Sequence, residues 1–293
     1  MPSEVVLGGR YRLGAQLGGG SEAYVNEAWD LQSGNRVAVK IFRSTDSTGN
    51  APFRRELEVH GRLRHKNIVK VLDSGTDATA NTVAGGSQVS PNFVVMELVD
   101  GKDLRGFLRE QATYPEQATY PGQAPSPEQT AAWMTDIARA LAHVHRRGIV
   151  HNDVKPGNIL LDFASDAGGR EPGGPGIAKL ADFGIALNGR HAAPNSSSGT
   201  PHYLSPEEVC GGMSTTASDI YSLGLVALEC LTGTKAFPGT PLESMVARTL
   251  GEPRIPGTVR RRWSMVLHAM TDPVPAGRPS ASQTVGMLRR LSW

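Results

Sequence analysis

The alternation of apolar and polar positions in the first third of the chain predicts β-strands. In VAVKIF (37–42), the branched apolar residues point one way and Ala38 and Lys40 share the other face, because successive side chains of a strand alternate. NFVVMELV (92–99) is a second apolar run of strand length. Between these runs, the apolar residues of PFRRELEVHGRLRH (52–65) fall roughly on one side of a predicted helix.

The pattern of the remaining chain is mainly helical. Ser126, Pro127 and Gln129 form a helix-start signature, with a capping hydroxyl, a proline at the first helical position and a glutamine two residues after that proline. Apolar residues follow at helical spacing, and Gly148 is expected to end this helix. A second buried helix is predicted from about residue 219 to 233.

Three segments resemble loops inserted into this frame. Residues 77–91 and 164–176 are rich in small residues, Gly and Pro, and we expect them to bury little surface and to be mobile. The third, near 110–125, contains the hexapeptide EQATYP twice, at 110–115 and 116–121. It is interpreted as a duplicated surface spacer or, alternatively, as a partner-docking motif, since two short copies are too few for a solenoid.

Composition narrows the class of protein. The 293 residues are 39% hydrophobic, which is enough for one large domain or two modest lobes. The net charge is only +2, and the sequence contains no clustered Lys and Arg of the kind typical of a nucleic-acid binder. Cys210 and Cys230 cannot make a disulfide framework. We find neither a signal peptide nor an apolar run long enough to cross a membrane. These features lead us to expect a cytoplasmic, stand-alone domain that ends soon after its last amphipathic pattern, at Trp293.

A glycine-rich stretch is the first candidate for chemistry. LGGGSEAYV (17–25) places Gly18 and Gly20 in a tight turn between two strand-like stretches, where backbone N–H groups can approach phosphate oxygens. Taken alone, it could equally be an ordinary glycine-rich hairpin. Lys40 follows one strand later, on the same face as Ala38. A lysine that faces into a cleft needs an anion to balance its charge. Glu56 on the next helix can supply one partner and a phosphate the other.

The stretch HNDVKPGN (151–158) is the second candidate. Asp153 can accept a proton from an attacking hydroxyl, and Lys155 can offset charge on a transferred phosphoryl group. Asn158 offers an amide oxygen, a hard ligand suited to Mg²⁺. The alternative is a polar turn between a helix and a strand. Asp182 then follows in an Asp-Phe-Gly tripeptide, after a further apolar run.

The ordered set of motifs resembles the eukaryotic-like protein kinases, and within them the bacterial serine/threonine kinases. The set comprises the glycine-rich loop, VAVK, a helix glutamate, HxDxKPxN, DFG, GTPHYLSPEE, DIYSLG and GRPS, and the resemblance runs from about residue 11 to 291. It implies an α+β, bilobal kinase fold forming a single domain over 1–293. The small, β-rich N-lobe with one main helix would span about 1–98, and the larger, mainly helical C-lobe about 99–293.

The resemblance also implies a role for each site residue. Lys40 would hold the α- and β-phosphates and pair with Glu56, Asp153 would be the catalytic base, and Lys155 would contact the γ-phosphate. ATP would lie between the lobes, with Mg²⁺, or alternatively Mn²⁺, on Asn158 and Asp182. The nucleotide-binding residues would be Leu17, Gly18, Gly20, Val25, Ala38, Lys40, Met96, Glu97, Val99, Asp103 and Leu160.

Further matches concern the C-lobe and the substrate. Glu207 would pair with Arg278, and Asp219 would brace the catalytic loop through its backbone. The sequence KPGN after the base is the serine/threonine form of the loop. Thr200 matches the residue that ties the substrate-binding segment to the catalytic Asp and Lys, so a protein substrate with a Ser or Thr acceptor is expected. We expect no nucleic-acid partner and no membrane insertion; the oligomeric state is not readable from the sequence.

The chain departs from the family pattern at three positions. Ala23 replaces the third glycine of the phosphate loop, and His60 stands where an apolar residue is usual, so a buried imidazole there would need a partner unless it stays partly solvated. Asn152 replaces the arginine that, in many kinases, grips a phosphate on the activation loop. Our hypothesis is that activity does not require phosphorylation of that loop, whose candidate acceptors are Ser196, Ser197 and Ser198. The alternative is that another basic residue, such as Arg190, replaces the clamp.

Three functions fit these residues to different degrees. The main prediction is an active serine/threonine kinase that also phosphorylates itself. The alternative is a pseudokinase scaffold that binds nucleotide without turnover, supported only by Ala23, His60 and Asn152. A small-molecule phosphotransferase can share the catalytic loop, but such enzymes usually lack the GTPHYLSPEE segment (199–208) and its partner Arg278.

Overall fold

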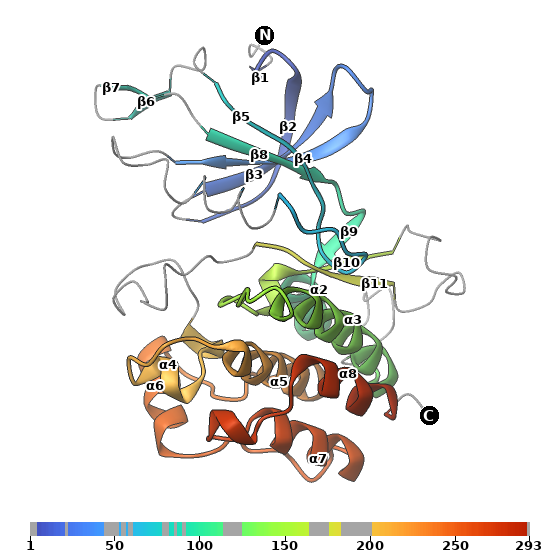
Figure 1. The fold of residues 1–293 in the computed structure, drawn as a ribbon, viewed down its shortest axis with the longest axis vertical. Coiled ribbons are helices and arrows are strands. Elements are labelled where there is room, and N and C mark those ends of the chain that lie inside the picture. Colours follow the sequence, from blue (N-terminus) through green and yellow to red (C-terminus); the bar gives the residue numbers. More distant parts are fainter. Residues whose placement is uncertain are drawn as a thin grey trace. The chain divides into compact units, whose positions relative to one another are not determined.

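The computed structural model describes residues 5–20, 23–43, 53, 57, 61–77, 82–84, 87–89, 92–113, 125–163, 176–182 and 201–291. The chain divides into two compact units, shown in Figure 1. The first, called the sheet unit below, comprises residues 1–64 and 69–99, and the second, the helical unit, comprises residues 65–68 and 100–293.

The sheet unit is built on an antiparallel sheet of six strands in the order β1-β2-β3-β4-β8-β5. The two strands predicted from the alternating pattern, 37–42 and 92–99, are present as β4 and β8, and the glycine-rich stretch joins β2 to β3. The strands are β1 (Val6–Leu7), β2 (Tyr11–Gly19), β3 (Ala23–Asp30), β4 (Arg36–Phe42), β5 (Val71–Thr76) and β8 (Asn92–Glu97).

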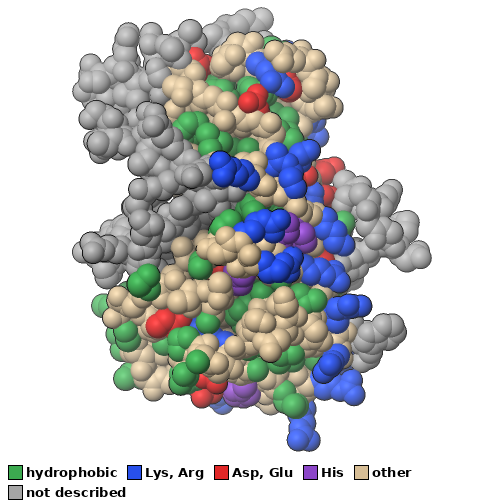
Figure 2. All heavy atoms as spheres, in the orientation of Figure 1, with side chains coloured by type: hydrophobic (Ala, Val, Ile, Leu, Met, Phe, Trp, Pro, Cys, Tyr) green, Lys and Arg blue, Asp and Glu red, His purple; other side chains and the backbone are tan. Residues whose placement is uncertain are grey.

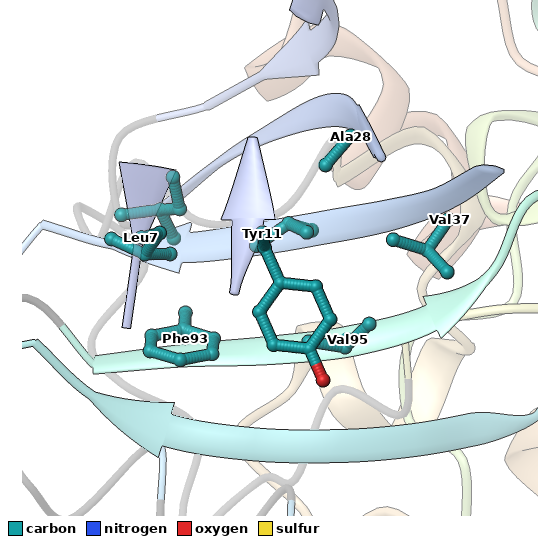
Figure 3. Close-up of a cluster of buried hydrophobic side chains, with 8 residues drawn as sticks. Leu7, Tyr11, Ala28, Val37, Phe93 and Val95 are labelled. Carbon is teal, nitrogen blue, oxygen red and sulfur yellow. The ribbon is translucent and has the colours of Figure 1, made fainter. Parts of the chain in front are cut away.

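One face of this sheet carries the core of the unit. Val37, Val39 and Ile41 alternate along β4 and are nearly inaccessible to solvent, at 3%, 0% and 2% exposure. They pack with residues of β1, β2, β3 and β8 in one apolar cluster, in which the rings of Tyr11 and Phe93 meet edge to face with centroids 5.9 Å apart (Figure 3). The register that buries this cluster necessarily turns the alternate residues of β4 to the opposite face.

Two sequence expectations for the sheet unit were wrong in extent. The stretch 77–91, predicted as a loop, contains a two-stranded hairpin of β6 (Thr82–Ala84) and β7 (Ser87–Val89). The helix predicted over 52–65 ends earlier: Phe53 and Leu57 are helical, but residues 61–62 form a turn and 63–65 are not helical. The intervening residues of that helix, including Glu56 and His60, lie outside the described residues.

The helical unit contains a buried helix that begins and ends where the sequence predicts. Helix α3 spans Pro127–His145, and Ser126 and Gln129 cap its start reciprocally. Gly148 follows its end in the left-handed conformation, with φ of 71°. The predicted second helix is α5 (Thr216–Thr232), which begins three residues earlier than expected, because Thr215 caps it, and ends at Gly233, also left-handed.

The other elements of the helical unit surround these two helices. A three-stranded sheet in the order β11-β10-β9 lies beside α3, and the loop 151–158 runs from the end of α3 to the start of β10. The bounds are β9 (Gly101–Asp103), α2 (Leu104–Thr113), β10 (Ile159–Asp162), β11 (Ile177–Leu180), α4 (Pro206–Val209), α6 (Pro241–Leu250), α7 (Arg261–Met270) and α8 (Ala281–Arg289), with short 3-10 turns at Pro156–Asn158, Pro201–Tyr203 and Pro275–Gly277.

The predicted insertions fall partly outside the described chain. Helix α2 continues to Thr113, so the first EQATYP copy begins in a helix, and 114–124 lie outside the described residues. Residues 164–175 lie outside them as well. In the parts of the chain that are described, none of the helices combines the length and the apolar character that crossing a membrane requires.

Candidate active site

The loop HNDVKPGN is held by a buried carboxylate from α5. Asp219, 2% exposed, accepts the backbone N–H of His151 at Oδ2 (2.8 Å) and that of Asn152 at Oδ1 (2.9 Å). Its Oδ2 is also 2.8 Å from His145 Nε2 at the end of α3. The predicted brace by Asp219 is therefore present, and His145, which sequence reasoning did not single out, completes it.

His151, the first residue of this loop, has a buried imidazole ring that is neutral. It is inaccessible to solvent, and burial lowers its pKa below the ordinary value, although the charges of Asp219, Asp153 and Asp182 oppose that shift. Its Nε2 lies 3.2 Å from the carbonyl oxygen of Ala181, and its Nδ1 accepts the backbone N–H of Asp153 at 3.3 Å. These partners require a proton on Nε2 and a lone pair on Nδ1, so the ring links Asp153 to the residue before Asp182.

Asp153 has one restrained carboxylate oxygen and one that is not engaged. Its Oδ2 accepts Lys155 Nζ at 2.7 Å and Asn158 Nδ2 at 2.8 Å. Asn158 Nδ2 also donates to the Asp153 carbonyl at 2.9 Å, which fixes the loop between the two residues. Among the described residues, Oδ1 of Asp153 accepts no hydrogen bond. The structure thus brings together three of the predicted site residues around one carboxylate.

Asn158 and Asp182 are the residues predicted to bind a divalent cation. The Ala181 N–H donates to the Asn158 carbonyl at 2.9 Å, so the strand end that carries Asp182 is tied to Asn158. The amide nitrogen of Asn158 is taken by Asp153, which leaves its amide oxygen as an acceptor. One carboxylate and one amide oxygen fit Mg²⁺, because this ion typically uses few protein ligands and completes its shell with phosphates and water.

The sheet unit presents a second group of predicted residues on one face. Antiparallel pairing places Val25 opposite Lys40, Ala38 opposite Met96, and Gly18 opposite Val25. Directly paired residues share a face, and this face is opposite to the apolar cluster. Ala38 and Met96 are 7% and 5% exposed. Lys40 therefore does not point into the core. It lies beside the small and apolar residues that are predicted to contact a nucleotide.

The other residues of the sheet unit that are predicted to contact a nucleotide lie at the end of β8 and in the glycine turn after β2. The Glu97 N–H donates to the Lys70 carbonyl at 2.9 Å, and the Glu97 side chain accepts the Lys70 N–H at 2.9 Å. Val99 makes no hydrogen bond within the described part of the chain. Leu17, at the start of the glycine turn, is 52% exposed, and the Gly20 N–H closes that turn by donating to the Ala23 carbonyl at 2.8 Å.

In the helical unit, Asp103 and Leu160 are paired across β9 and β10. Asp103 Oδ1 also accepts the backbone N–H of Gly106 at 2.6 Å, so its carboxylate caps the start of α2. Its predicted contact with a ribose stays a prediction. The roles of Glu56, Thr200 and Ser196–Ser198 concern residues outside the described chain.

The segment after residue 200 is fastened to the helices beneath it. The Tyr203 hydroxyl donates to Glu229 at 2.6 Å, and Ser222 Oγ donates to the Tyr203 carbonyl at 2.7 Å. Arg248 on α6, 2% exposed, donates to the carbonyl of Pro201 at 2.9 Å and to that of His202. Sequence reasoning missed Arg248, because nothing in its local pattern distinguishes it from a surface arginine of an amphipathic helix.

Sequence reasoning also missed a cluster of basic residues, made of His65, Lys66, Arg139, His143 and Arg146. The His65 and His143 rings stack with centroids 4.9 Å apart, and Figure 2 shows Lys, Arg and His side chains gathered on the face of this unit. Burial, followed by the charge of His143 and then those of Lys66, Arg139 and Arg146, lowers the pKa of His65 to about 4. The cluster joins segments far apart in the sequence, so the net charge of +2 does not reveal it.

Comparison with known proteins places this geometry in context. Residues 11–287 match the family described as the protein kinase domain. The chain is 36% identical over 242 residues to a probable serine/threonine-protein kinase of Corynebacterium efficiens. It is 33% identical over 264 residues to the serine/threonine-protein kinase PrkC of Bacillus subtilis, and 35% identical over 265 residues to the serine/threonine-protein kinase PknB of Mycobacterium leprae. These alignments cover 80%, 88% and 87% of the chain, which spans only about a third of the relatives' lengths, at 32%, 35% and 37%.

Proposed function

The chain belongs to the protein kinase family, and from this premise we propose that it transfers the γ-phosphate of ATP to serine and threonine hydroxyls of a protein substrate, including its own. The observation that carries the proposal is the arrangement at Asp153. Lys155 and Asn158 hold one of its carboxylate oxygens, and the other is not engaged by any described residue. That is the arrangement a general base needs, fixed in place but able to accept a proton.

The reaction asks mainly for positioning and charge stabilisation from the protein. Asp153 orients the acceptor hydroxyl and takes its proton as the oxygen attacks the γ-phosphorus of ATP, the bond from that phosphorus to the β,γ-bridging oxygen breaks and ADP leaves. Lys155, 2.7 Å from Asp153, carries the positive charge that offsets the developing negative charge on the transferred group. Because Asn158 bonds both the backbone and the side chain of Asp153, the base keeps its place through the turnover.

Mg²⁺ is the cofactor that fits the ligand set. Asn158 and Asp182 are the residues that would hold it, and when bound it supplies neutralisation of the phosphate charge. His151 orients both partners, since it contacts the Asp153 N–H on one side and the Ala181 carbonyl on the other.

The sheet unit is proposed to bind the nucleotide. Lys40 supplies a positive charge for the α- and β-phosphates, and Ala38 and Met96 supply the flat, apolar surface that an adenine ring needs. Backbone N–H groups of the glycine turn at Gly18 and Gly20 are the remaining phosphate ligands.

The acceptor class and a protein substrate are inferred from the loop and the segment after it. KPGN is the serine/threonine form of the catalytic loop, and the relatives are named serine/threonine-protein kinases. The segment Pro201–Tyr203, held by Ser222, Glu229 and Arg248, is a rigid platform of the kind a peptide substrate requires.

Control by activation-loop phosphorylation is not expected. Asn152 has a left-handed backbone, with φ of 66°, and its backbone N–H is bound to Asp219. Its side-chain Oδ1 is buried and has no partner among the described residues. A neutral amide in this place has no charge with which to bind a phosphate. Asp219 therefore holds the catalytic loop without help from an activation-loop phosphate.

Mass spectrometry of phosphate transfer tests the proposed function. The purified chain is incubated with Mg·ATP, with and without a generic protein that contains Ser and Thr acceptors, alongside Asp153→Asn. Transfer to serine or threonine that disappears in the variant supports the kinase. Nucleotide binding without transfer would indicate a pseudokinase, and transfer to small hydroxyl compounds but not to protein would indicate a small-molecule phosphotransferase.

A further inference from the structure

Arg105 occupies the end of helix α2 where a positive charge is least favourable. The N-terminus of a helix carries partial positive charge, so cations stabilise the opposite end. Arg105 is nevertheless the second residue of α2 and is exposed. The first turn of the helix contains no acidic residue, and the Asp103 carboxylate just before it binds the Gly106 N–H. Stabilisation of the helix therefore does not explain this arginine.

The guanidinium of Arg105 lies directly against the catalytic loop. A β-carbon added to Gly157 would overlap Nη2 of Arg105 and lie 2.9 Å from its Cζ. The backbone of Gly157 does not require glycine, because its φ is outside the left-handed region. Glycine at this position, two residues after Lys155, is instead what makes room for the arginine.

The charge of the same guanidinium also acts on the Tyr203 hydroxyl, in the segment after residue 200. Burial raises the pKa of the Tyr203 hydroxyl, and the charge of Arg105 opposes that shift. The arginine is thus near both the loop that carries Asp153 and the platform proposed to receive a peptide. All of these residues belong to the helical unit.

The carboxylates of β9 and α2, and the one that binds Tyr203, already have partners. Glu229 accepts the Tyr203 hydroxyl at 2.6 Å, Glu110 accepts Lys102 Nζ at 2.5 Å, and Asp103 accepts the Gly106 N–H at 2.6 Å. Arg105 itself makes no hydrogen bond or ion pair within the described part of the chain. An exposed guanidinium with no anion, beside the catalytic loop at Gly157, is available to a ligand that binds there.

We propose that Arg105 selects protein substrates that carry a Glu or Asp close to the acceptor Ser or Thr. The inference rests on the proposed kinase function and names its substrate class. To place its hydroxyl at Asp153, a peptide must pass over the neighbours of the catalytic loop, where a flanking carboxylate meets the planar, two-pronged donor of Arg105. A flanking Lys or Arg meets the same charge and is repelled.

Three matched peptides test this proposal. They share one Ser acceptor and differ only in the residues within three positions on either side, which are Glu, Gln or Lys. The full chain should show the highest kcat/KM for the Glu peptide, about fivefold above the Gln peptide, as expected for a solvent-accessible ion pair. The difference should lie mainly in KM, because Arg105 contacts the flank and not the reacting atoms.

Variants separate the contact from overall charge. Arg105→Gln should make kcat/KM for the Glu and Gln peptides equal, and Arg105→Glu should favour the Lys peptide. The control is Arg109→Glu, which makes the same charge change one turn along the exposed side of α2 and should keep the wild-type preference. In all three variants, kcat/KM for the Gln peptide should stay near the wild-type value, which also shows that each variant is folded.

The outcomes distinguish this inference from the proposed function. No transfer to any peptide by the wild-type chain overturns both. Transfer with equal kcat/KM for the Glu and Lys peptides overturns the Arg105 proposal alone, as does a preference for Glu that persists in Arg105→Glu. Reversal of the preference in Arg105→Glu but not in Arg109→Glu supports it.

Discussion

Arg278 binds both carboxylate oxygens of Glu207, with Nη1 at 2.7 Å from Oε1 and Nη2 at 2.8 Å from Oε2. The Arg278 side chain is fully inaccessible and that of Glu207 is 18% exposed. The guanidinium also lies over the Tyr221 ring, 4.8 Å from its centroid. This pair fastens the segment that begins α4 to the turn before α8, and the sequence-based prediction of the pairing is confirmed.

Breaking this pair should strongly destabilise the chain. Arg278→Met leaves a largely buried carboxylate without its partner, and removal of one member of such a pair typically costs about 3–5 kcal/mol. The measurement is the free energy of unfolding in urea. Arg260→Met is the matched control, since the Arg260–Glu128 pair is 70% and 54% exposed and should contribute little. Equal effects of the two substitutions would contradict the account.

The stability of the chain should decrease in mild acid because of His65. Its folded-state pKa of about 4 lies below the ordinary 6.5, so the unfolded chain binds the proton more readily. The contribution of the neutral ring is present above pH 6.5 and is lost as the pH falls toward 4. His65→Gln should therefore show a shallower decrease in the free energy of unfolding between these pH values. Parallel decreases in the variant and the wild type would count against the prediction.

The backbone conformation of Asn152 should itself affect stability, apart from the lack of charge on its side chain. A left-handed φ of 66° is tolerated by Asn and Gly but not by Ala. Asn152→Ala and Asn152→Gly both remove the side chain, so their difference isolates the backbone conformation. We expect the Ala variant to be less stable than the Gly variant by about 1 kcal/mol, as measured by thermal unfolding. Equal stability would mean that the loop relaxes to another conformation.

The phosphorylation state of the activation loop should have little influence on activity. Asn152 offers no positive charge to a loop phosphate, so a Ser196/Ser197/Ser198→Ala variant should keep its initial rate. The comparison starts from phosphatase-treated protein, so that neither sample carries phosphate. A large loss of rate in the variant would indicate that another residue, such as Arg190, provides the clamp.

Much of the fold could be predicted because local signals agreed with the tertiary structure. The family of bacterial serine/threonine protein kinases and the bilobal fold are confirmed by the match over residues 11–287. The period-two pattern of β4 led to the correct buried face, and the capping residues around α3 led to its correct ends. The catalytic loop was recognised because its chemistry lies within eight consecutive residues, 151–158.

The missed features depend on contacts between distant segments. Arg248 acquires its role where α6 meets Pro201–Tyr203, and His145 where α3 meets α5. The basic cluster forms where His65 meets α3. The space beside Gly157 is occupied by the guanidinium of Arg105, which comes from a distant part of the sequence. The hairpin β6–β7 was overlooked because small residues and glycine obscure the alternation that indicates strands.

The most direct test of the central claim compares single-turnover phosphoryl transfer by the wild-type chain and Asp153→Asn, with Mg·ATP and a serine peptide. The substitution keeps the size of the side chain but removes the oxygen that accepts the proton. Asp153 as the base predicts that Mg·ATP binding is little changed while the transfer rate falls by about 100-fold or more. Transfer by Asp153→Asn at the wild-type rate would contradict the assignment of the catalytic base and, with it, the proposed mechanism.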